Sequence, residues 1–245
     1  MTRLRKTKSP ARSREMLERT LDPADWESFR GLAHAILDDA IDYVRDVRKR
    51  KPWQPLPDSA KGALSAPLPE KGQPLEKVYR DFRRNIMPYP LGNLHPRHWG
   101  WVNGSGTPEG MLAEMLAAAM NSNVTGHDQA PVWVELQVIN WFKKLFRLPA
   151  AAGGLLVSGG SMANLTALLA ARTYAAGGFA RDKGIGGKGA PKFTVYGSVE
   201  AHYCMPRALD VMGLGRGAFR AIRTRADFTV DTEALRFQIA EDRKA

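Results

Sequence analysis

Residues 155–172 read LLVSGGSMANLTALLAAR, and this stretch indicates how the chain is organised. A short apolar run, interpreted as a strand, leads into a Ser-Gly-Gly-Ser turn, and an alanine- and leucine-rich helix is predicted to begin near Ser161. Gly159 and Gly160 lack Cβ atoms, so the backbone there can turn sharply and approach a ligand closely. The first N–H groups of the helix lack intrahelical partners and carry the positive end of the helix dipole. This join is therefore a candidate site for an anion.

The same turn also has a purely structural interpretation, in which Ser161 caps the helix and the glycines make a tight connection. It does not match the common nucleotide motifs, because no Lys-Ser or Lys-Thr pair follows the glycines and the spacing GxGxxG is absent. A phosphate bound here is therefore expected to belong to something other than a nucleotide.

Composition places the chain among globular proteins, since 44% of its 245 residues are hydrophobic and 25% are charged. No run approaches the roughly 20 apolar residues that a membrane helix needs, so no membrane partner is expected. The basic start is not followed by the apolar segment of a secretory signal. Cys204 is the single cysteine, which excludes an intrachain disulfide and favours a cytoplasmic location.

Of the net charge of +11, +5 lies in residues 1–20, which hold seven Lys or Arg against two Glu. Such a segment is either a nucleic-acid-binding arm or a solvated tail. No aromatic residue interleaves with the charges to stack on bases, so we expect a disordered tail and no nucleic-acid partner.

Residues 21–92 are expected to form a separate helical segment. Apolar residues within 25–50 recur at helical spacing, and a second helix is predicted from Leu75 to about Asn85. The proline-rich residues 51–74 between them are interpreted as an irregular linker. Two such helices bury little surface alone, so we expect them to pack on the rest of the chain or on a partner subunit.

Residues 93–245 are expected to form an α/β domain. Helices are predicted at 110–121, from Pro131 and at 205–212, and strands at 193–198 and 219–222. Strands that alternate with helices in this way are typical of a mostly parallel sheet.

Four segments resemble one family: HPRHWGWVNGSGTPEGMLAEMLAAAMNSN, APVWVELQVINWF, the stretch quoted first, and VYGSVEAHYCMPRALDVMGLG. They are similar to the pyridoxal-phosphate-dependent group II decarboxylases, which include the aromatic-L-amino-acid, glutamate and histidine decarboxylases. The resemblance runs from about Asp22 to the last residue. It implies the aspartate-aminotransferase-like (type I) fold, with a mostly parallel sheet, and a homodimer in which amino-terminal helices wrap the partner subunit.

The resemblance also implies roles for individual residues. Gly160 and Ser161, with Gly159 in the same turn, would bind the phosphate of pyridoxal phosphate. His202 in EAHYC matches the histidine that stacks on the pyridine ring and that holds the substrate carboxylate or assists proton transfer. Judged without the family, a lone histidine just past a strand would be interpreted as a satisfied loop residue.

The loop HWGWVNG matches a substrate-side loop of the family, which makes Trp101 and Val102 candidate substrate-binding residues. The alternative is that both belong to the core at the edge of a domain. His95 and His127 have no partner at metal-ligand spacing, so no metal site is expected. Both are interpreted as structural, and the resemblance places His127 where loops of the family meet the other subunit.

Decarboxylation of an amino acid leaves negative charge at Cα, and a conjugated pyridinium ring can accept it. The resemblance implies a lysine in a His-Lys-Trp stretch that anchors the cofactor and an acid in an Asp-Ala-Ala stretch that keeps the ring nitrogen protonated. Neither stretch occurs in these 245 residues. We therefore expect about the first half of an L-amino-acid decarboxylase, with 93–245 as the amino-terminal half of its cofactor domain, that is inactive alone.

Trp101 and Val102 slightly favour an aromatic substrate over glutamate. Two alternatives remain open. One is another type I enzyme, such as an aminotransferase. The other is a non-catalytic truncated paralogue that acts as a dimer partner.

Overall fold

A computed structural model describes residues 20–125, 128–177, 179–186 and 189–244 of the chain. The predicted basic tail, apart from residue 20, and His127 lie outside the described residues. The chain divides into two units, Met1–Ser122 and Asn123–Ala245, and each is considered by itself. Among the described residues, no helix combines the length and apolar character needed to cross a membrane.

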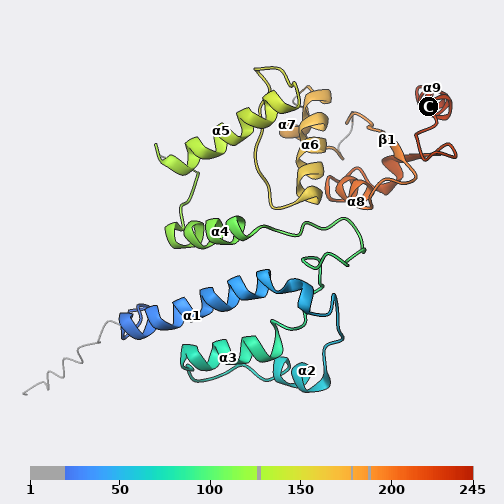
Figure 1. Cartoon of the computed structure of the whole chain (residues 1–245). Coiled ribbons are helices and arrows are strands. Elements are labelled where there is room, and N and C mark those ends of the chain that lie inside the picture. Colours follow the sequence, from blue (N-terminus) through green and yellow to red (C-terminus); the bar gives the residue numbers. More distant parts are fainter. Residues whose placement is uncertain (1–19, 126–127, 178, 187–188, 245) are drawn as a thin grey trace, which may run out of the picture. The chain divides into compact units, whose positions relative to one another are not determined.

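The described part of the first unit is helical (Figure 1). Its elements are α1 (Trp26–Arg45), the short 3-10 helix η1 (Val47–Lys49), α2 (Asp58–Leu64), α3 (Leu75–Asn85) and α4 (Pro108–Met120). The prediction for Leu75–Asn85 is confirmed at both ends.

Helix α2 corrects the prediction that residues 51–74 are irregular throughout. Its seven residues contain no proline, because Pro57 is the N-cap and the next proline is Pro67. Proline is well tolerated at a helix start and disrupts only the interior. Ala60 is buried, and α2 contacts α3, so the linker contributes to the packing of this unit.

Polar contacts from one carboxylate connect α1 to α3. The hydroxyl of Tyr79 donates a hydrogen bond to Asp39 over 2.5 Å, and Arg83 forms an ion pair with the same carboxylate over 3.3 Å. Burial and this hydrogen bond raise the pKa of Tyr79 to about 12. The phenol therefore remains a donor throughout the ordinary pH range.

The second unit alternates helices with two short strands (Figure 1). Its elements are α5 (Ala130–Leu145), α6 (Gly160–Ala175), α7 (Phe179–Lys183), β1 (Val195–Ser198), α8 (Cys204–Val211), the 3-10 helix η2 (Arg216–Ala218), β2 (Phe219–Ile222) and α9 (Thr232–Asp242).

The sheet among the described residues has two strands, β1 and β2, which pair in parallel from Val195 opposite Phe219 to Ser198 opposite Ile222. Helix α8 forms the crossover between them and contacts β2 and α6. Leu209 on α8 is fully buried, and Ile222 on β2 is 4% exposed. The expected α/β architecture is thus confirmed on a small scale.

The expected strand at residues 155–157 is not formed. Leu155 and Leu156 are 59% and 55% exposed, and no ladder partner pairs with this run among the described residues. A strand is defined by hydrogen bonds to a neighbour, so an apolar extended run without one stays irregular.

A half-buried polar cluster connects α9 to the two strands. Asp242 accepts hydrogen bonds from the hydroxyl of Tyr196 on β1, over 3.0 Å, and from the guanidinium of Arg220 on β2, over 3.0 Å. Burial favours the neutral acid, but these hydrogen bonds outweigh that effect and lower the pKa of Asp242. The ionised carboxylate therefore connects three elements of the unit.

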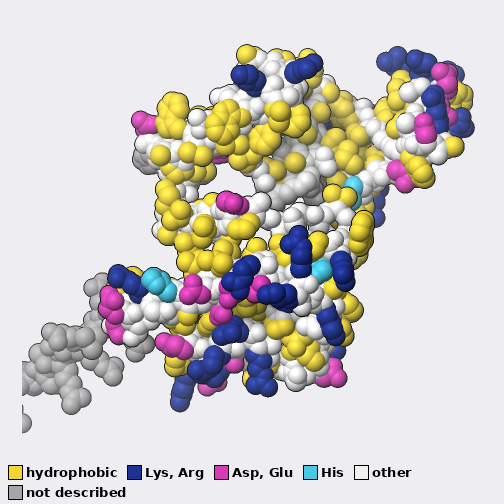
Figure 2. All heavy atoms as spheres, viewed as in Figure 1, with side chains coloured by type: hydrophobic (Ala, Val, Ile, Leu, Met, Phe, Trp, Pro, Cys, Tyr) yellow, Lys and Arg dark blue, Asp and Glu magenta, His cyan; other side chains and the backbone are white. Residues whose placement is uncertain are grey.

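Large apolar side chains remain exposed in the second unit. On α5, Trp133, Trp141 and Phe142 are 63%, 61% and 46% exposed. Hydrophobic side chains gather on the visible surface around α5 (Figure 2). Contiguous apolar surface of this kind is typical of a face that another part of a protein covers.

Candidate functional site

The Ser-Gly-Gly-Ser turn forms the start of α6, as its sequence predicts. Gly159 is the N-cap residue, and no side chain caps the helix. The first backbone bond that closes the helix runs from the N–H of Ala163 to the carbonyl of Gly159 over 3.0 Å. The N–H groups of Gly160 and Ser161 precede it. The interpretation of Ser161 as the capping residue is therefore wrong, since Ser161 lies inside the first turn.

The space beside the two glycines is open. A Cβ atom built on Gly159 or on Gly160 would meet no other heavy atom within 4 Å. Packing among the described residues therefore does not require glycine at either position. Exposed N–H groups, an exposed hydroxyl and room for a close approach to the backbone are what a phosphate group needs. The residues present thus fit the phosphate of the cofactor that the sequence implies.

His202 lies in the turn between β1 and α8, and its side chain is exposed. Its Nδ1 accepts a hydrogen bond from the backbone N–H of Cys204 over 3.2 Å. In the neutral ring the proton is therefore on Nε2, which is a donor. The ring lies 4.2 Å from the ring of Tyr203, tilted by 39°. One edge of the imidazole is fixed, and the other is available to a ligand.

A hydrogen bond that the sequence reasoning missed connects the two candidate elements. The side-chain amide of Asn164, in the first part of α6, donates to the sulfur of Cys204 over 3.2 Å. Asn164 is three residues beyond Ser161, and Cys204 is two residues beyond His202. Cys204 is 4% exposed, so this contact lies in the packed region between α6 and α8. A polar residue in an apolar helix and a lone cysteine were the available signals.

The general rule for open parallel sheets gives a place for a ligand near His202. Ligands of such sheets bind beyond the carboxyl ends of the strands, where helix N-termini also meet. His202 follows the carboxyl end of β1, and Ser161 is at the start of α6. The structure brings these two elements together through α8.

Trp101 and Val102 belong to the first unit and are described within it. Trp101 is 82% exposed and has a left-handed backbone with φ of 52°, and Val102 is fully exposed. Neither side chain is packed in the core of the unit as described. Their apolar side chains are available to a ligand or to another part of the protein.

His95 also belongs to the first unit and is 6% exposed. Within the described ranges, no three His, Cys, Asp or Glu side chains gather in a way that could hold a metal ion.

Comparison with known proteins identifies the chain's relatives. Residues 57–245 match the family described as pyridoxal-dependent decarboxylase conserved domain. The aromatic-L-amino-acid decarboxylase of Bacillus atrophaeus is 32% identical over 225 residues, which cover 89% of this chain and 44% of that protein. The phenylacetaldehyde synthase of Petunia hybrida is 32% identical over 244 residues, which cover 92% of this chain and 45% of that protein. The chain spans about half the length of the curated relatives it matches.

The crystal structure of Oryza sativa TDC with PLP and tryptamine has a similar fold, with a TM-score of 0.78 at 22% sequence identity. The match covers 92% of this chain and 48% of that one. The fold is therefore that of the type I pyridoxal-phosphate enzymes, represented in part. The chain belongs to the pyridoxal-dependent decarboxylase family, a family of carboxy-lyases whose cofactor is pyridoxal phosphate.

Proposed function

We propose that the protein containing this chain removes the α-carboxylate of an L-amino acid, preferably an aromatic one, and releases an amine and carbon dioxide. Family membership and the names of the relatives support this proposal. The observation that carries it is the open first turn of α6, connected to the segment of His202 by the bond between Asn164 and Cys204.

In this proposal, Gly159, Gly160 and Ser161 hold the phosphate of the cofactor through backbone N–H groups and the serine hydroxyl. His202 stacks on the ring of the cofactor, and its Nε2–H binds the substrate carboxylate or moves a proton. When bound, pyridoxal phosphate supplies a pyridinium ring that accepts the electron pair left at Cα. Trp101 and Val102 line the substrate pocket with apolar surface, which favours an aromatic side chain.

We also propose that different parts of the chain have different roles. Residues 21–92 serve dimerisation in a cytoplasmic homodimer, and residues 93–245 contribute the amino-terminal part of the cofactor domain. Residues 1–245 by themselves do not decarboxylate, because they contain neither a His-Lys-Trp nor an Asp-Ala-Ala stretch to anchor and protonate the cofactor.

Cofactor binding by these 245 residues tests the role of the turn. Phosphorus NMR of pyridoxal phosphate should report binding, and Ser161→Ala should weaken it about tenfold, because a hydrogen bond to a charged group is lost. Ser65→Ala is the matched control, since it removes an exposed serine hydroxyl from α2's C-cap in the other unit. Equal affinity of both variants for pyridoxal phosphate would show that Ser161 does not contribute to phosphate binding.

Activity is tested with the complete product of the gene, supplied with pyridoxal phosphate. Release of carbon dioxide and an amine from an aromatic L-amino acid is expected. Because a phenylacetaldehyde synthase is as similar as a decarboxylase, an aldehyde in place of the amine is the second candidate outcome. Formation of a keto acid without carbon dioxide would contradict decarboxylation and indicate an aminotransferase. Carbon dioxide release by residues 1–245 alone would contradict the proposed inactivity.

A further inference from the structure

Two histidines of the chain make the same local hydrogen bond. Nδ1 of His95 accepts from the backbone N–H of Arg97 over 3.0 Å, and Nδ1 of His202 accepts from the backbone N–H of Cys204 over 3.2 Å. In each neutral ring the proton is therefore on Nε2. The two rings differ in burial, since His95 is 6% exposed and His202 is exposed.

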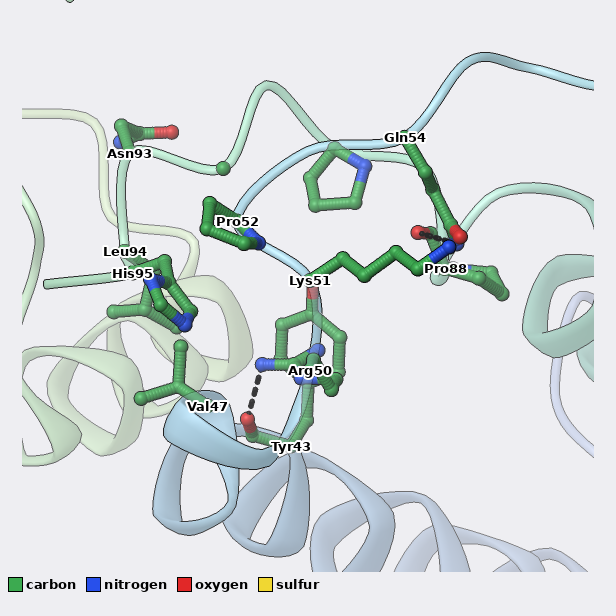
Figure 3. Close-up of a pocket in the computed structure, with 12 residues that line it drawn as sticks. Tyr43, Val47, Arg50, Lys51, Pro52, Gln54, Pro88, Asn93, Leu94 and His95 are labelled. Atoms are coloured by element: carbon green, nitrogen blue, oxygen red, sulfur yellow. Dashed lines mark hydrogen bonds between the residues drawn. The ribbon is translucent and has the colours of Figure 1, made fainter. Parts of the chain in front are cut away.

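Packing fixes the segment of His95. The ring lies in the wall of a cavity of about 420 Å³ in the first unit, between the end of α1, η1 and the segments 50–54 and 88–95 (Figure 3). Gly92 has a φ of +92°, and a Cβ atom built on it would lie 1.8 Å from the carbonyl oxygen of Pro52. Only glycine permits so close an approach of the two segments. His202 has no comparable enclosure, so its hydrogen bond needs another support.

That support is at the start of α8. Cys204 is the first residue of this helix, and the side chain of Tyr203, the N-cap residue, makes no capping hydrogen bond. The first N–H groups of a helix have no partner within the helix and lie at the positive end of its dipole. Both effects favour a lone pair on Nδ1 of His202, which accepts from the N–H of Cys204.

The position of Cys204 is itself fixed by α6. Its sulfur, in a side chain that is 4% exposed, accepts a hydrogen bond from the side-chain amide of Asn164 over 3.2 Å. Near the other end of the pair, Nη1 of Arg172 donates to the carbonyl of Met212 over 3.2 Å. Each contact joins residues that are 40 apart in the sequence. The two helices therefore run in the same direction, and their N-termini lie at the same end.

The ring of Tyr203 restrains His202 in a different way. The two rings are 4.2 Å apart and tilted by 39°, and the guanidinium of Arg207 lies 4.8 Å from the centre of the Tyr203 ring. This packing limits how the imidazole can turn. It does not select which nitrogen carries the proton, so the tautomer depends on the hydrogen bond from Cys204.

The tautomer matters for the role proposed for His202. A carboxylate only accepts hydrogen bonds, so it binds a ring nitrogen that donates one. With the proton on Nδ1, the neutral ring would present the lone pair of Nε2 to the carboxylate. The proton must therefore be held on Nε2 if the neutral ring is to bind the substrate.

We propose that Asn164 is a positioning residue for His202. Through the sulfur of Cys204 it fixes the first residue of α8, and the N–H of that residue keeps the proton of His202 on Nε2. The inference rests on the proposed function for the role of His202. The tautomer itself can be measured in this chain without cofactor or substrate.

The test is nitrogen-15 NMR of the 245-residue chain at about pH 8.5, where histidine rings are ordinarily neutral. Long-range proton–nitrogen correlations distinguish the two tautomers, and the rings are assigned through the backbone. Nε2–H should predominate in His202. Asn164→Leu keeps the approximate size of the side chain but removes its amide. It should lower the ratio of Nε2–H to Nδ1–H in His202 about threefold or more, because a hydrogen bond is weakened.

The chain offers two controls. Arg172→Leu removes the other polar contact between α6 and α8, so it weakens the packing of the helices without touching Cys204, and the ratio should stay unchanged. The ratio of His95, in the other unit, should stay unchanged in every variant. Cys204→Ser keeps an acceptor for Asn164 and should preserve the ratio of His202, whereas Cys204→Ala should lower it as Asn164→Leu does.

Three results would overturn the proposal. They are a predominance of Nδ1–H in His202 of the unchanged chain, an unaltered ratio in Asn164→Leu, and an equal decrease in Arg172→Leu. The last would show that helix packing alone is responsible. If Asn164→Leu does not fold, the substitutions of Cys204 decide. A lower ratio in Cys204→Ala than in Cys204→Ser supports the proposal, and equal ratios contradict it. None of these measurements depends on decarboxylation, so the proposed function is tested separately.

Discussion

Leu209→Ala should destabilise the second unit substantially. Leu209 is fully buried on α8, the helix that crosses from β1 to β2 and contacts α6. The substitution removes three carbons, and at about 0.8 kcal/mol for each buried carbon the lost transfer free energy is roughly 2.4 kcal/mol. The cavity left behind adds to this, so we expect a loss of about 3–4 kcal/mol in the free energy of unfolding.

Urea unfolding followed by far-UV circular dichroism measures this change. Val211→Ala is the matched control, because Val211 is on the same helix but is 69% exposed. It should cost at most about 0.5 kcal/mol, as substitutions at exposed positions generally do. The slope of the free energy against urea should stay unchanged in both variants, which shows that the extent of unfolding is the same.

Equal losses in the two variants would refute the reasoning, since α8 would then not be anchored through Leu209. The result also bears on the candidate site. Helix α8 begins two residues after His202, and its first residue, Cys204, receives the hydrogen bond from Asn164. Weaker docking of α8 should therefore lower the affinity for pyridoxal phosphate as well, without removing any group that touches it.

Three further predictions concern the first unit. Thr107→Ala should cost about 1 kcal/mol, because the Thr107 hydroxyl caps α4, and an unchanged urea midpoint would contradict this. Gly92→Ala should lower the melting temperature, because a left-handed backbone and a backbone oxygen both oppose a Cβ, whereas Gly31→Ala in the open middle of α1 should not. The raised pKa of Tyr79 means that its contribution to stability is complete below pH 10 and is lost as the pH rises through about 12. In an ultraviolet titration of the tyrosines, the ionisation step at the highest pH should disappear in Tyr79→Phe. If that step persists, it does not belong to Tyr79, and the hydrogen bond to Asp39 does not raise the pKa of this phenol.

Local patterns were sufficient to predict several of the helices. The residues from Leu75 to Asn85 follow a proline and repeat at helical spacing, so their own sequence determines the element. Residues 155–157 show the opposite case. Their apolar run indicates a strand, but a strand also needs a neighbour, which their own sequence does not supply.

The many prolines in residues 51–74 suggest an irregular segment, but their positions leave residues 58–64 free of proline, and these residues form α2. In the candidate site, the turn at Gly160 was predicted from residue types alone. Its connection to the segment of His202 depends on how α6 packs on α8, and no spacing in the sequence encodes the contact between Asn164 and Cys204. Sequence patterns thus predict the individual segments of the candidate site, whereas the packing of α6 on α8 determines which residues of those segments are in contact.

The contact of Gly92 with the carbonyl of Pro52 also affects how this chain can diverge in evolution. Even the smallest substitution of Gly92, to alanine, places a methyl group against a backbone oxygen. A change there becomes tolerable only when residues 50–54 shift as well. Among orthologues, substitutions in the two segments should therefore be correlated, although they are separated by more than thirty positions along the chain.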